Sequence, residues 1–227
     1  MRIFTRFSLS FTALGLIFAA SPASAIQFDS DVPAAVREQV QDDLGMVAGL
    51  RGGAGSRLHR EIFGDVSGAT YAKWFNRRVN QAGRSLCWED NAVACVLTAW
   101  ENKIWFSPNY TSFSHPQIAR LMVIFHEARH TEAAEGFWPH RKCPTPFLDE
   151  QGNEVRSIWT GSSLAGEMAC DDEAKGAYGI AVIFLKNIAK NCTSCTEKVK
   201  MDAELYGTDQ LNRITNSVYR RELSEDR

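Results

Sequence analysis

Hydrophobic residues recur at helical spacing in two segments of the N-terminal third. Residues 31–50 carry Pro33 near their start, and residues 67–82 begin with the cap candidate Ser67. The apolar stripe of the first segment comprises Val36, Val40, Leu44 and Val47, and that of the second comprises Tyr71, Trp74, Phe75 and Val79. We predict an amphipathic helix for each segment. The glycine-rich residues 52–56 favour a linker between them.

The middle of the chain has the pattern of a β-hairpin followed by a buried helix. Residues 92–100 and 103–106 are rich in Val, Trp, Ile and Phe on either side of a polar tip, which is typical of paired strands. Residues 114–134 then show helical spacing, with apolar side chains around nearly the whole circumference between positions 121 and 125. We therefore expect a central, buried helix that ends before Gly136.

Two further helices are predicted in the C-terminal third. Residues 164–189 are largely apolar, although Gly176 and Gly179 interrupt the pattern. Residues 197–217 are mostly polar, and we expect them to cover the outside of the molecule through Val199, Leu205, Leu211 and Ile214. Together, the segments predict one α+β, predominantly helical domain over residues 26–227.

The first 25 residues have the pattern of a secretory signal. Arg2 and Arg6 form a short basic region, residues 7–20 are mostly apolar, and Ala-Ser-Ala at 23–25 offers a cleavage site after Ala25. The apolar run is too short for a transmembrane span. We therefore expect a secreted or periplasmic protein without stable membrane insertion after cleavage.

The overall composition narrows the functional classes. The 227 residues are 44% hydrophobic and 23% charged, which is typical of a globular protein and excludes a disordered or collagen-like chain. Lys and Arg number 25 against 27 Asp and Glu, so the formal net charge is −2. This balance gives no reason to expect nucleic acid as a partner.

The six cysteines are best explained as disulfides if the chain is exported. Six cysteines allow fifteen pairings. Sequence separation favours Cys87 with Cys95, Cys143 with Cys170, and Cys192 with Cys195. The last pair is a C-x-x-C, but the β-α-β setting of a thioredoxin-like redox motif is absent. Three bridges would leave histidines and carboxylates as the candidate metal ligands.

The end of the predicted central helix carries the sequence His-Glu-Ala-Arg-His at positions 126–130. His126 and His130 are four residues apart, so they share one helical face and can hold one Zn²⁺ through their ring nitrogens. Glu127 lies between them and can act as a general base. Zinc lowers the pKa of a bound water toward 7, which makes this combination suited to hydrolysis.

This H-E-x-x-H helix resembles that of the zincin metallopeptidases. The resemblance implies His126 and His130 as zinc ligands and Glu127 as the catalytic base. It also implies a strand before the helix, within the predicted hairpin, that aligns extended substrate by main-chain hydrogen bonds. The resemblance covers residues 92–180 at most, and its specific part is the five-residue motif.

A catalytic zinc normally has three protein ligands, and the third is open between several candidates. His140 follows the helix breaker Gly136 by four residues, although its spacing differs from the H-E-x-x-H-x-x-G-x-x-H of one zincin subgroup. Glu167 and Asp171 resemble the E-x-x-x-D of zincins whose third ligand is a glutamate and whose aspartate orients a ligand histidine. Asp171 or Asp172 could instead match the aspartate of G-T-x-D-x-x-Y-G, but Gly-Thr is missing here. A Cys143–Cys170 bridge would draw all of these candidates together.

Other residues near the motif have a functional and a structural interpretation. Tyr178 could hydrogen-bond a developing oxyanion, or could simply pack in the core. Trp105 and Trp138 could line a substrate cleft, or be buried aromatics. Arg129 is expected to form a structural salt bridge, with Glu132 as one candidate partner. Two other histidines, His59 and His115, lack ligand spacing.

These observations predict an exported, disulfide-bonded zinc metallopeptidase of peptide or protein substrates. Two alternatives stay open. One is a non-catalytic binding or structural domain, in which a fourth ligand would close the zinc site. The other is a zinc amidase that acts on cell-wall peptides, which keeps the chemistry and changes the substrate.

Overall fold

The computed structural model describes residues 26–84, 87, 92–100, 102–112, 114–149 and 151–226. The elements in this part of the chain are β1 (Gln27–Phe28), α1 (Ala34–Gly49), α2 (Arg57–Ile62), α3 (Gly68–Asn76), β2 (Gln81–Arg84), β3 (Ala94–Cys95), β4 (Lys103–Phe106), α4 (Asn109–Ser112), α5 (Gln117–His130), the 3₁₀ helix η1 (Ala133–Glu135), α6 (Ala177–Asn191), α7 (Glu197–Asn212) and α8 (Ser217–Glu225). The architecture is therefore mixed α+β and mainly helical, as expected.

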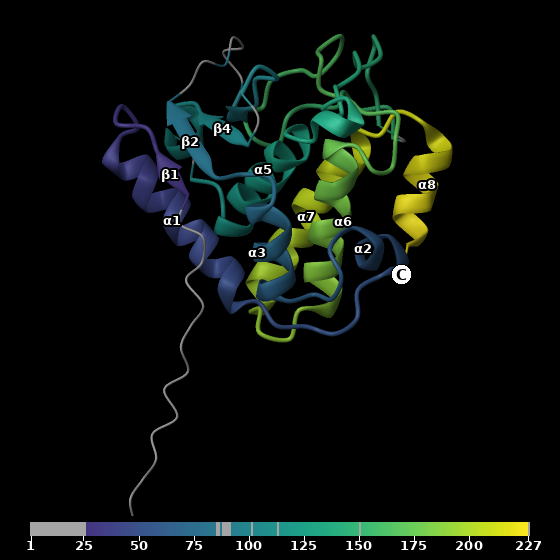
Figure 1. The fold of residues 1–227 in the computed structure, drawn as a ribbon. Coiled ribbons are helices and arrows are strands. Elements are labelled where there is room, and N and C mark those ends of the chain that lie inside the picture. The colour runs from purple at the N-terminus through teal and green to yellow at the C-terminus, as the bar shows by residue number, and fades with distance from the viewer. Residues whose placement is uncertain are drawn as a thin grey trace, which may run out of the picture.

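Helices α5 and α6 lie side by side at the centre of the molecule, between α1 on one flank and α8 on the other (Figure 1). As the apolar circumference of its sequence predicts, α5 is buried from Leu121 to Arg129. The rings of Phe125 on α5 and Phe184 on α6 stack with centroids 4.5 Å apart, and Trp74 of α3 also stacks on Phe125, at 5.5 Å. Such aromatic contacts hold the helices at fixed separation.

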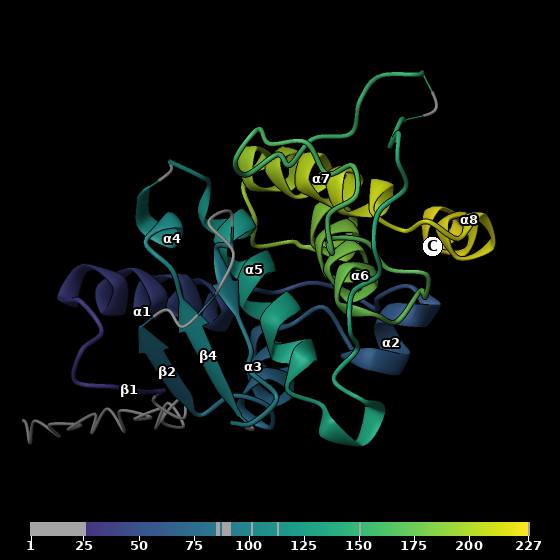
Figure 2. The same ribbon diagram turned by 90° about the horizontal axis from the view of Figure 1, so that it is seen from above.

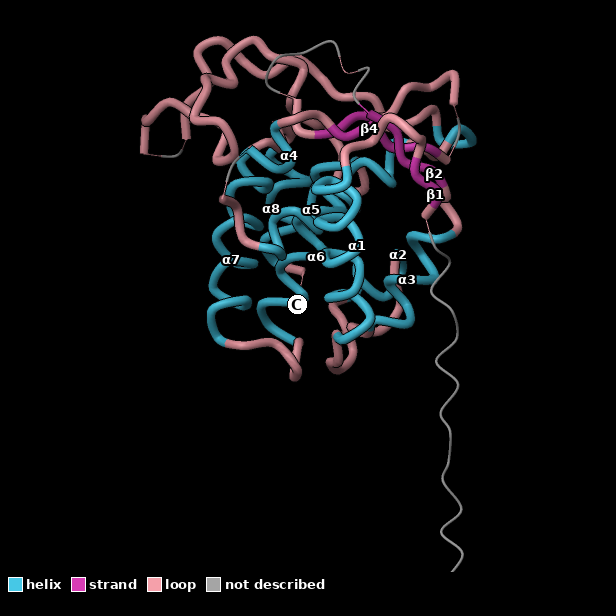
Figure 3. The backbone as a smooth tube through the Cα atoms, turned by 90° about the vertical axis from the view of Figure 1, so that its left-hand side faces the viewer, coloured by secondary structure: helices cyan, strands magenta, loops and turns pink. Residues whose placement is uncertain are grey.

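The four-stranded sheet has the order β1-β2-β4-β3. β3 and β4 pair antiparallel, with Ala94 opposite Phe106 and Cys95 opposite Trp105, which confirms the hairpin but with a shorter first strand than 92–100. β2 pairs parallel with both β1 and β4. Figure 3 shows the sheet at one end of the helices, together with long loops.

Several predicted helix boundaries are wrong. The helix predicted over 67–82 ends at Asn76, and residues from Gln81 onward form β2, because pairing with β4 outweighs local helical spacing. Its cap is correct, since the Ser67 hydroxyl accepts a hydrogen bond from the Thr70 amide. The central helix predicted over 114–134 is α5, which ends at His130.

The helix predicted over 164–189 begins only at Ala177, with Gly176 as its N-cap. Residues 164–176 form loops and turns instead, and Figure 2 shows loops leading into α6. The helix predicted over 197–217 is α7, which ends at Asn212, and only the last predicted residue, Ser217, belongs to α8; α7 packs against α6. Leu205 is 58% exposed and does not join the buried face.

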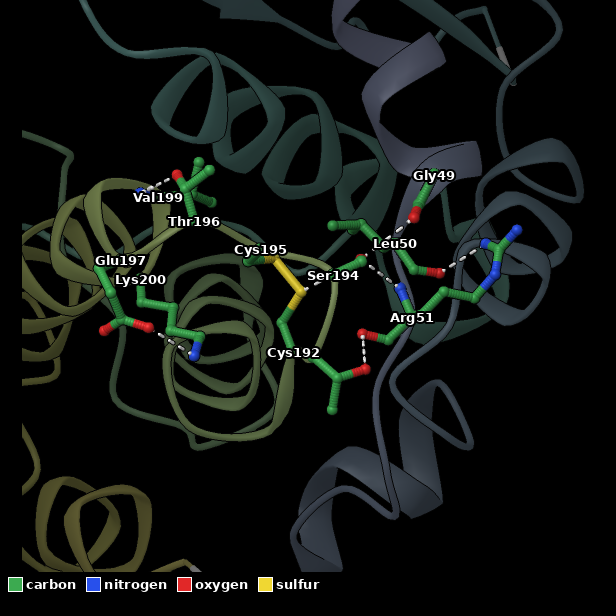
Figure 4. The surroundings of a disulfide bond; sticks show 11 residues. Gly49, Leu50, Arg51, Cys192, Ser194, Cys195, Thr196, Glu197, Val199 and Lys200 are labelled. Atoms are coloured by element: carbon green, nitrogen blue, oxygen red, sulfur yellow. Dashed lines mark hydrogen bonds and ion pairs between the residues drawn. A yellow bond between two sulfur atoms is a disulfide. The ribbon is translucent and has the colours of Figure 1, made fainter.

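All three predicted disulfides are present: Cys87–Cys95, Cys143–Cys170 and Cys192–Cys195. The third closes a tight loop at the end of α6 (Figure 4). Within that loop, the Ser194 hydroxyl accepts a hydrogen bond from the Arg51 amide at 2.8 Å and donates one to the Gly49 carbonyl at 3.1 Å. The C-x-x-C therefore fastens the end of α6 to the end of α1.

The predicted signal segment lies outside the described residues, which begin at Ile26. Within the described part, no helix has the length and apolar character needed to cross a bilayer. The disulfides are consistent with an exported protein.

Candidate metal centre

Helix α5 places His126 and His130 on one face in its last two turns. The helix stops directly afterwards, and Thr131 forms its C-cap. His126 is buried and His130 is partly buried. The rigid core helix therefore fixes both imidazoles before any ligand arrives.

A left-handed turn after η1 returns the chain to these two histidines and delivers His140. Gly136, Phe137 and Trp138 have φ angles of 67°, 65° and 50°. This conformation costs about 1 kcal/mol or more for each residue that is not glycine. Trp138 is held in it by Glu132, whose Oε2 accepts from the indole Nε1 at 2.8 Å, and by the Arg129 guanidinium, which lies 4.2 Å from the indole ring centre.

The three imidazoles point their Nε2 atoms at one another. The Nε2 separations are 3.1 Å between His126 and His140, 3.1 Å between His130 and His140, and 3.3 Å between His126 and His130. A tetrahedral zinc ion with bonds of ~2.0–2.1 Å holds its nitrogens about 3.3–3.4 Å apart. The triangle therefore fits one such ion, and these three residues can hold a metal.

The protonation of His126 and His130 suits metal binding. Burial lowers the pKa of His126 well below its ordinary value and lowers that of His130 to about 4. Both rings are then neutral near pH 7. His130 Nδ1 lies 2.9 Å from the Phe137 carbonyl oxygen, which requires the proton on Nδ1 and leaves the lone pair on Nε2.

Asp171 orients His140 from the side opposite the triangle. Its Oδ1 lies 2.8 Å from His140 Nδ1, and its Oδ2 accepts a hydrogen bond from the Tyr178 amide at 2.9 Å. Both carboxylate oxygens are thus engaged away from the Nε2 triangle. Of the other candidate ligands, Glu167 and Asp172 are not part of the triangle: Glu167 is exposed, and Asp172 pairs with Arg141.

Two segments far apart in the sequence meet at His140 and Asp171. Arg141 and Cys170 exchange backbone hydrogen bonds of 2.6 and 3.1 Å, and the Cys143–Cys170 disulfide lies directly beside them. As the sequence led us to expect, this bridge brings the candidate segments together.

Glu127 shares the cleft with the three histidines and is buried, with 7% of its surface exposed. Desolvation raises the pKa of its carboxyl group to about 8. A carboxyl group held in a low-dielectric site beside candidate metal ligands can take up and release a proton near neutral pH.

The cleft that these residues line has a volume of about 770 Å³. This size lies within the range of about 300–1,000 Å³ that is usual for ligand sites. The edge strand β3 and the residues after it form one wall, and the loop over residues 157–164 forms another. Most of this lining is apolar, with Trp159, Met122 and Leu164 among its larger side chains.

Tyr178 lies at the base of the cleft, in the first turn of α6. Its ring stacks on that of His140, with centroids 4.6 Å apart, and meets that of His126 edge-on at 4.5 Å. Its hydroxyl accepts a hydrogen bond from Nη1 of Arg213 at 2.9 Å. Arg213 escaped the sequence interpretation because it follows a polar helix, where an arginine is usually solvated.

The remaining candidates have structural surroundings. Arg129 pairs with Glu132 at 2.6 Å, as expected, and Glu132 also binds Arg78. Trp105 is buried, and neither it nor Trp138 lines the cleft, so of the two interpretations the structure favours packed aromatics over a lining role.

Neither of the other two histidines belongs to the metal centre. His59 is buried, where its ring nitrogens contact the Gly64 carbonyl and the Tyr71 hydroxyl. His115 stacks on Trp159 with ring centres 3.9 Å apart, and so supports a wall of the cleft.

Comparison with known proteins adds no relative: protein-family models, curated proteins and solved structures all gave no match.

Proposed function

We propose that this protein is an exported, zinc-dependent peptidase. The observation that carries the proposal is the convergence of the Nε2 atoms of His126, His130 and His140, 3.1–3.3 Å apart, in a cleft that Glu127 also lines. The H-E-x-x-H spacing and its resemblance to zincins support the same chemistry. Neutral imidazoles suit Zn²⁺, and three such ligands leave a coordination position for a substrate or water.

Each residue has a separate task in this proposal. The three histidines hold the ion, and Asp171 keeps His140 in the tautomer whose Nε2 carries a lone pair. Bound Zn²⁺ supplies Lewis-acid polarisation of the scissile carbonyl and lowers the pKa of the attacking water. Glu127 accepts the proton of that water and passes a proton to the leaving amine. Tyr178 remains a candidate donor to the developing oxyanion.

The arrangement favours a catalytic over a purely structural metal. A structural site would need a fourth protein ligand. Among the ligands that the sequence suggested, Asp171 is the one that contacts His140. Both of its oxygens are occupied, by His140 Nδ1 and by the Tyr178 amide. The edge strand β3 also borders the cleft, where an extended peptide could add to the sheet by main-chain hydrogen bonds.

The test is the Glu127→Gln variant of the mature protein. We expect it to keep about one zinc per chain and to lose peptide hydrolysis by at least about 100-fold, because the proton acceptor is gone. The matched control is Glu135→Gln, which changes an exposed glutamate on η1 and should leave the rate unaltered. Zinc is measured by atomic absorption and hydrolysis on casein and on short peptides.

A wild-type protein that binds no zinc, or a Glu127→Gln variant as active as wild type, would refute the proposal. Clearing of a cell-wall suspension without cleavage of casein would instead assign the same chemistry to cell-wall peptides.

A further inference from the structure

The cleft contains a buried arginine that the proposed reaction does not use. Arg213 lies at the end of α7, is 7% exposed and lines the same cleft as the three histidines. Among the described residues of the lining, it is the one Lys or Arg. A guanidinium stays charged at any physiological pH, so its burial is costly unless its charge and its N–H groups are compensated.

That compensation is incomplete. Nη1 donates to the Tyr178 hydroxyl, whereas Nε is buried and has no hydrogen-bond partner among the described residues. Asp209 forms an ion pair with Arg213, but its Oδ2 lies 3.5 Å from Nε, compared with the ~2.7–2.9 Å of a good charge-assisted hydrogen bond. The same oxygen already accepts from Nε2 of Gln210 at 2.7 Å. Arg213 therefore keeps one buried N–H without a hydrogen bond, and its charge is paired at 3.5 Å with a carboxylate oxygen that it shares with Gln210.

Tyr178 connects this charge to the metal centre. Its hydroxyl is 2.9 Å from Nη1 of Arg213, and its ring lies 4.5 Å from that of His126 and 4.6 Å from that of His140, between centroids. The guanidinium is thus one tyrosine side chain away from the candidate zinc ligands. A ligand group bound by Arg213 would lie close to a peptide bond presented to the metal.

We propose that Arg213 binds the terminal carboxylate of the substrate, which makes the cleft a site for peptides cleaved next to their free C-terminus. The planar guanidinium matches a carboxylate in shape, and a substrate carboxylate could accept shorter, paired hydrogen bonds than the 3.5 Å contact with Asp209 provides. The mainly apolar walls strengthen such a pair because they exclude water. This inference rests on the proposed peptidase function for its substrate, but the carboxylate site can be measured without catalysis.

Binding is measured by calorimetry on the full mature chain, both metal-free and zinc-loaded. The probes are N-acetyl-Ala-Ala, its C-terminal amide, and N-acetyl-Ala-Asp-amide, whose carboxylate is on a side chain. We expect the metal-free protein to bind the free acid at least about tenfold more tightly than the amide, because charged hydrogen bonds contribute about 1.5–3 kcal/mol. N-acetyl-Ala-Asp-amide should bind like the amide.

The Arg213→Gln variant should lose this preference, and Arg213→Lys should keep part of it. The control, Arg221→Gln, removes the same charge from an exposed position on α8 and should keep all of it. Equal affinities for acid and amide in the wild type would overturn the proposal, as would an intact preference in Arg213→Gln. The wild-type comparison decides the matter even if a variant does not fold, which circular dichroism would reveal.

Turnover of acid and amide peptides by the zinc-loaded protein separates the two proposals. Carboxylate binding without any hydrolysis would support the Arg213 site and refute the peptidase. Hydrolysis without preference for the free acid would support the peptidase and refute the Arg213 site. An equal fall in kcat for both substrates in Arg213→Gln would show that Arg213 acts on the chemical step through Tyr178, which also overturns the carboxylate assignment.

Discussion

At the scale of single residues, Asp171 shows how an outer group can control a metal ligand. The sequence offered it either as a metal ligand or as an aspartate that orients a ligand histidine, and its carboxylate lies on the Nδ1 side of His140, 2.8 Å away, as the second role requires. A carboxylate there fixes the ring orientation and raises the basicity of the opposite nitrogen. The Tyr178 amide fixes the carboxylate in turn.

The Asp171→Asn variant is therefore expected to bind zinc at least about tenfold more weakly, while remaining folded. Competition with a chromogenic chelator measures the affinity. Asp172→Asn is the control, because that side chain is 47% exposed and pairs with Arg141. Equal zinc affinity in Asp171→Asn and wild type would show that His140 does not depend on this contact.

His59 lies far from the metal centre in sequence and should make stability depend on pH. Burial lowers its pKa from 6.5 to about 4, against the opposing effects of the Gly64 carbonyl, Asp226 and Asp65. Between these two values the unfolded chain binds the proton and the folded chain does not. Stability is therefore complete above pH 6.5 and falls as the pH decreases toward 4, by at most about 3 kcal/mol from this residue.

Urea unfolding from pH 7.5 to 4 tests this expectation by comparing wild type with His59→Gln, whose side chain does not titrate. The stability advantage of wild type should shrink as the pH decreases. Because other titrating groups are common to both proteins, their effects cancel in the difference. If the free energies of unfolding of wild type and His59→Gln changed in parallel from pH 7.5 to 4, the lowered pKa of His59 would be contradicted.

At the scale of elements, the errors in the predicted boundaries share a cause. β2 and the loop before α6 have local sequences compatible with helix, but their backbones pair with distant segments. Arg141 and Cys170 pair in this way and leave the residues before Ala177 outside the helix. Such pairing depends on contacts that helical spacing does not reveal.

The start of α6 also has a close approach that requires glycine. A Cβ on Gly176 would lie 2.5 Å from Oδ2 of Asp171, so Gly176→Ala must displace that carboxylate. We expect the variant to lose zinc affinity together with stability. Gly45→Ala is the control: its Cβ would meet nothing within 4 Å in the exposed middle of α1, and it should stabilise the protein by about 0.5–1 kcal/mol. Unchanged zinc affinity in Gly176→Ala would show that the carboxylate can move without consequence.

At the scale of the whole molecule, the Cys143–Cys170 disulfide links stability to the metal centre, since it fastens the segments of His140 and Asp171. Replacing both cysteines by serine should lower the free energy of unfolding by about 3 kcal/mol for a separation of 27 residues, and should weaken zinc binding.

Replacing Cys192 and Cys195 provides the comparison. Their separation is three residues and their loop contacts the end of α1, so we expect a smaller loss of stability, about 1–2 kcal/mol, and unchanged zinc affinity. Denaturant unfolding and chelator competition measure both quantities. If both cysteine replacements changed zinc affinity equally, the Cys143–Cys170 disulfide would have no specific effect on the metal centre.

The sequence by itself determined the features that depend on local spacing and composition: the mainly helical α+β class, the buried helix α5, the shared face of His126 and His130, and the three cysteine pairs. Only the tertiary structure decided how distant segments meet. It brought His140 into the triangle through a left-handed turn, moved Asp171 behind that histidine, and buried Arg213 beside Tyr178. Helical periodicity extends over a few residues, whereas these contacts join residues that lie 14 to 35 positions apart, and the sequence pattern does not show which of such distant residues will meet.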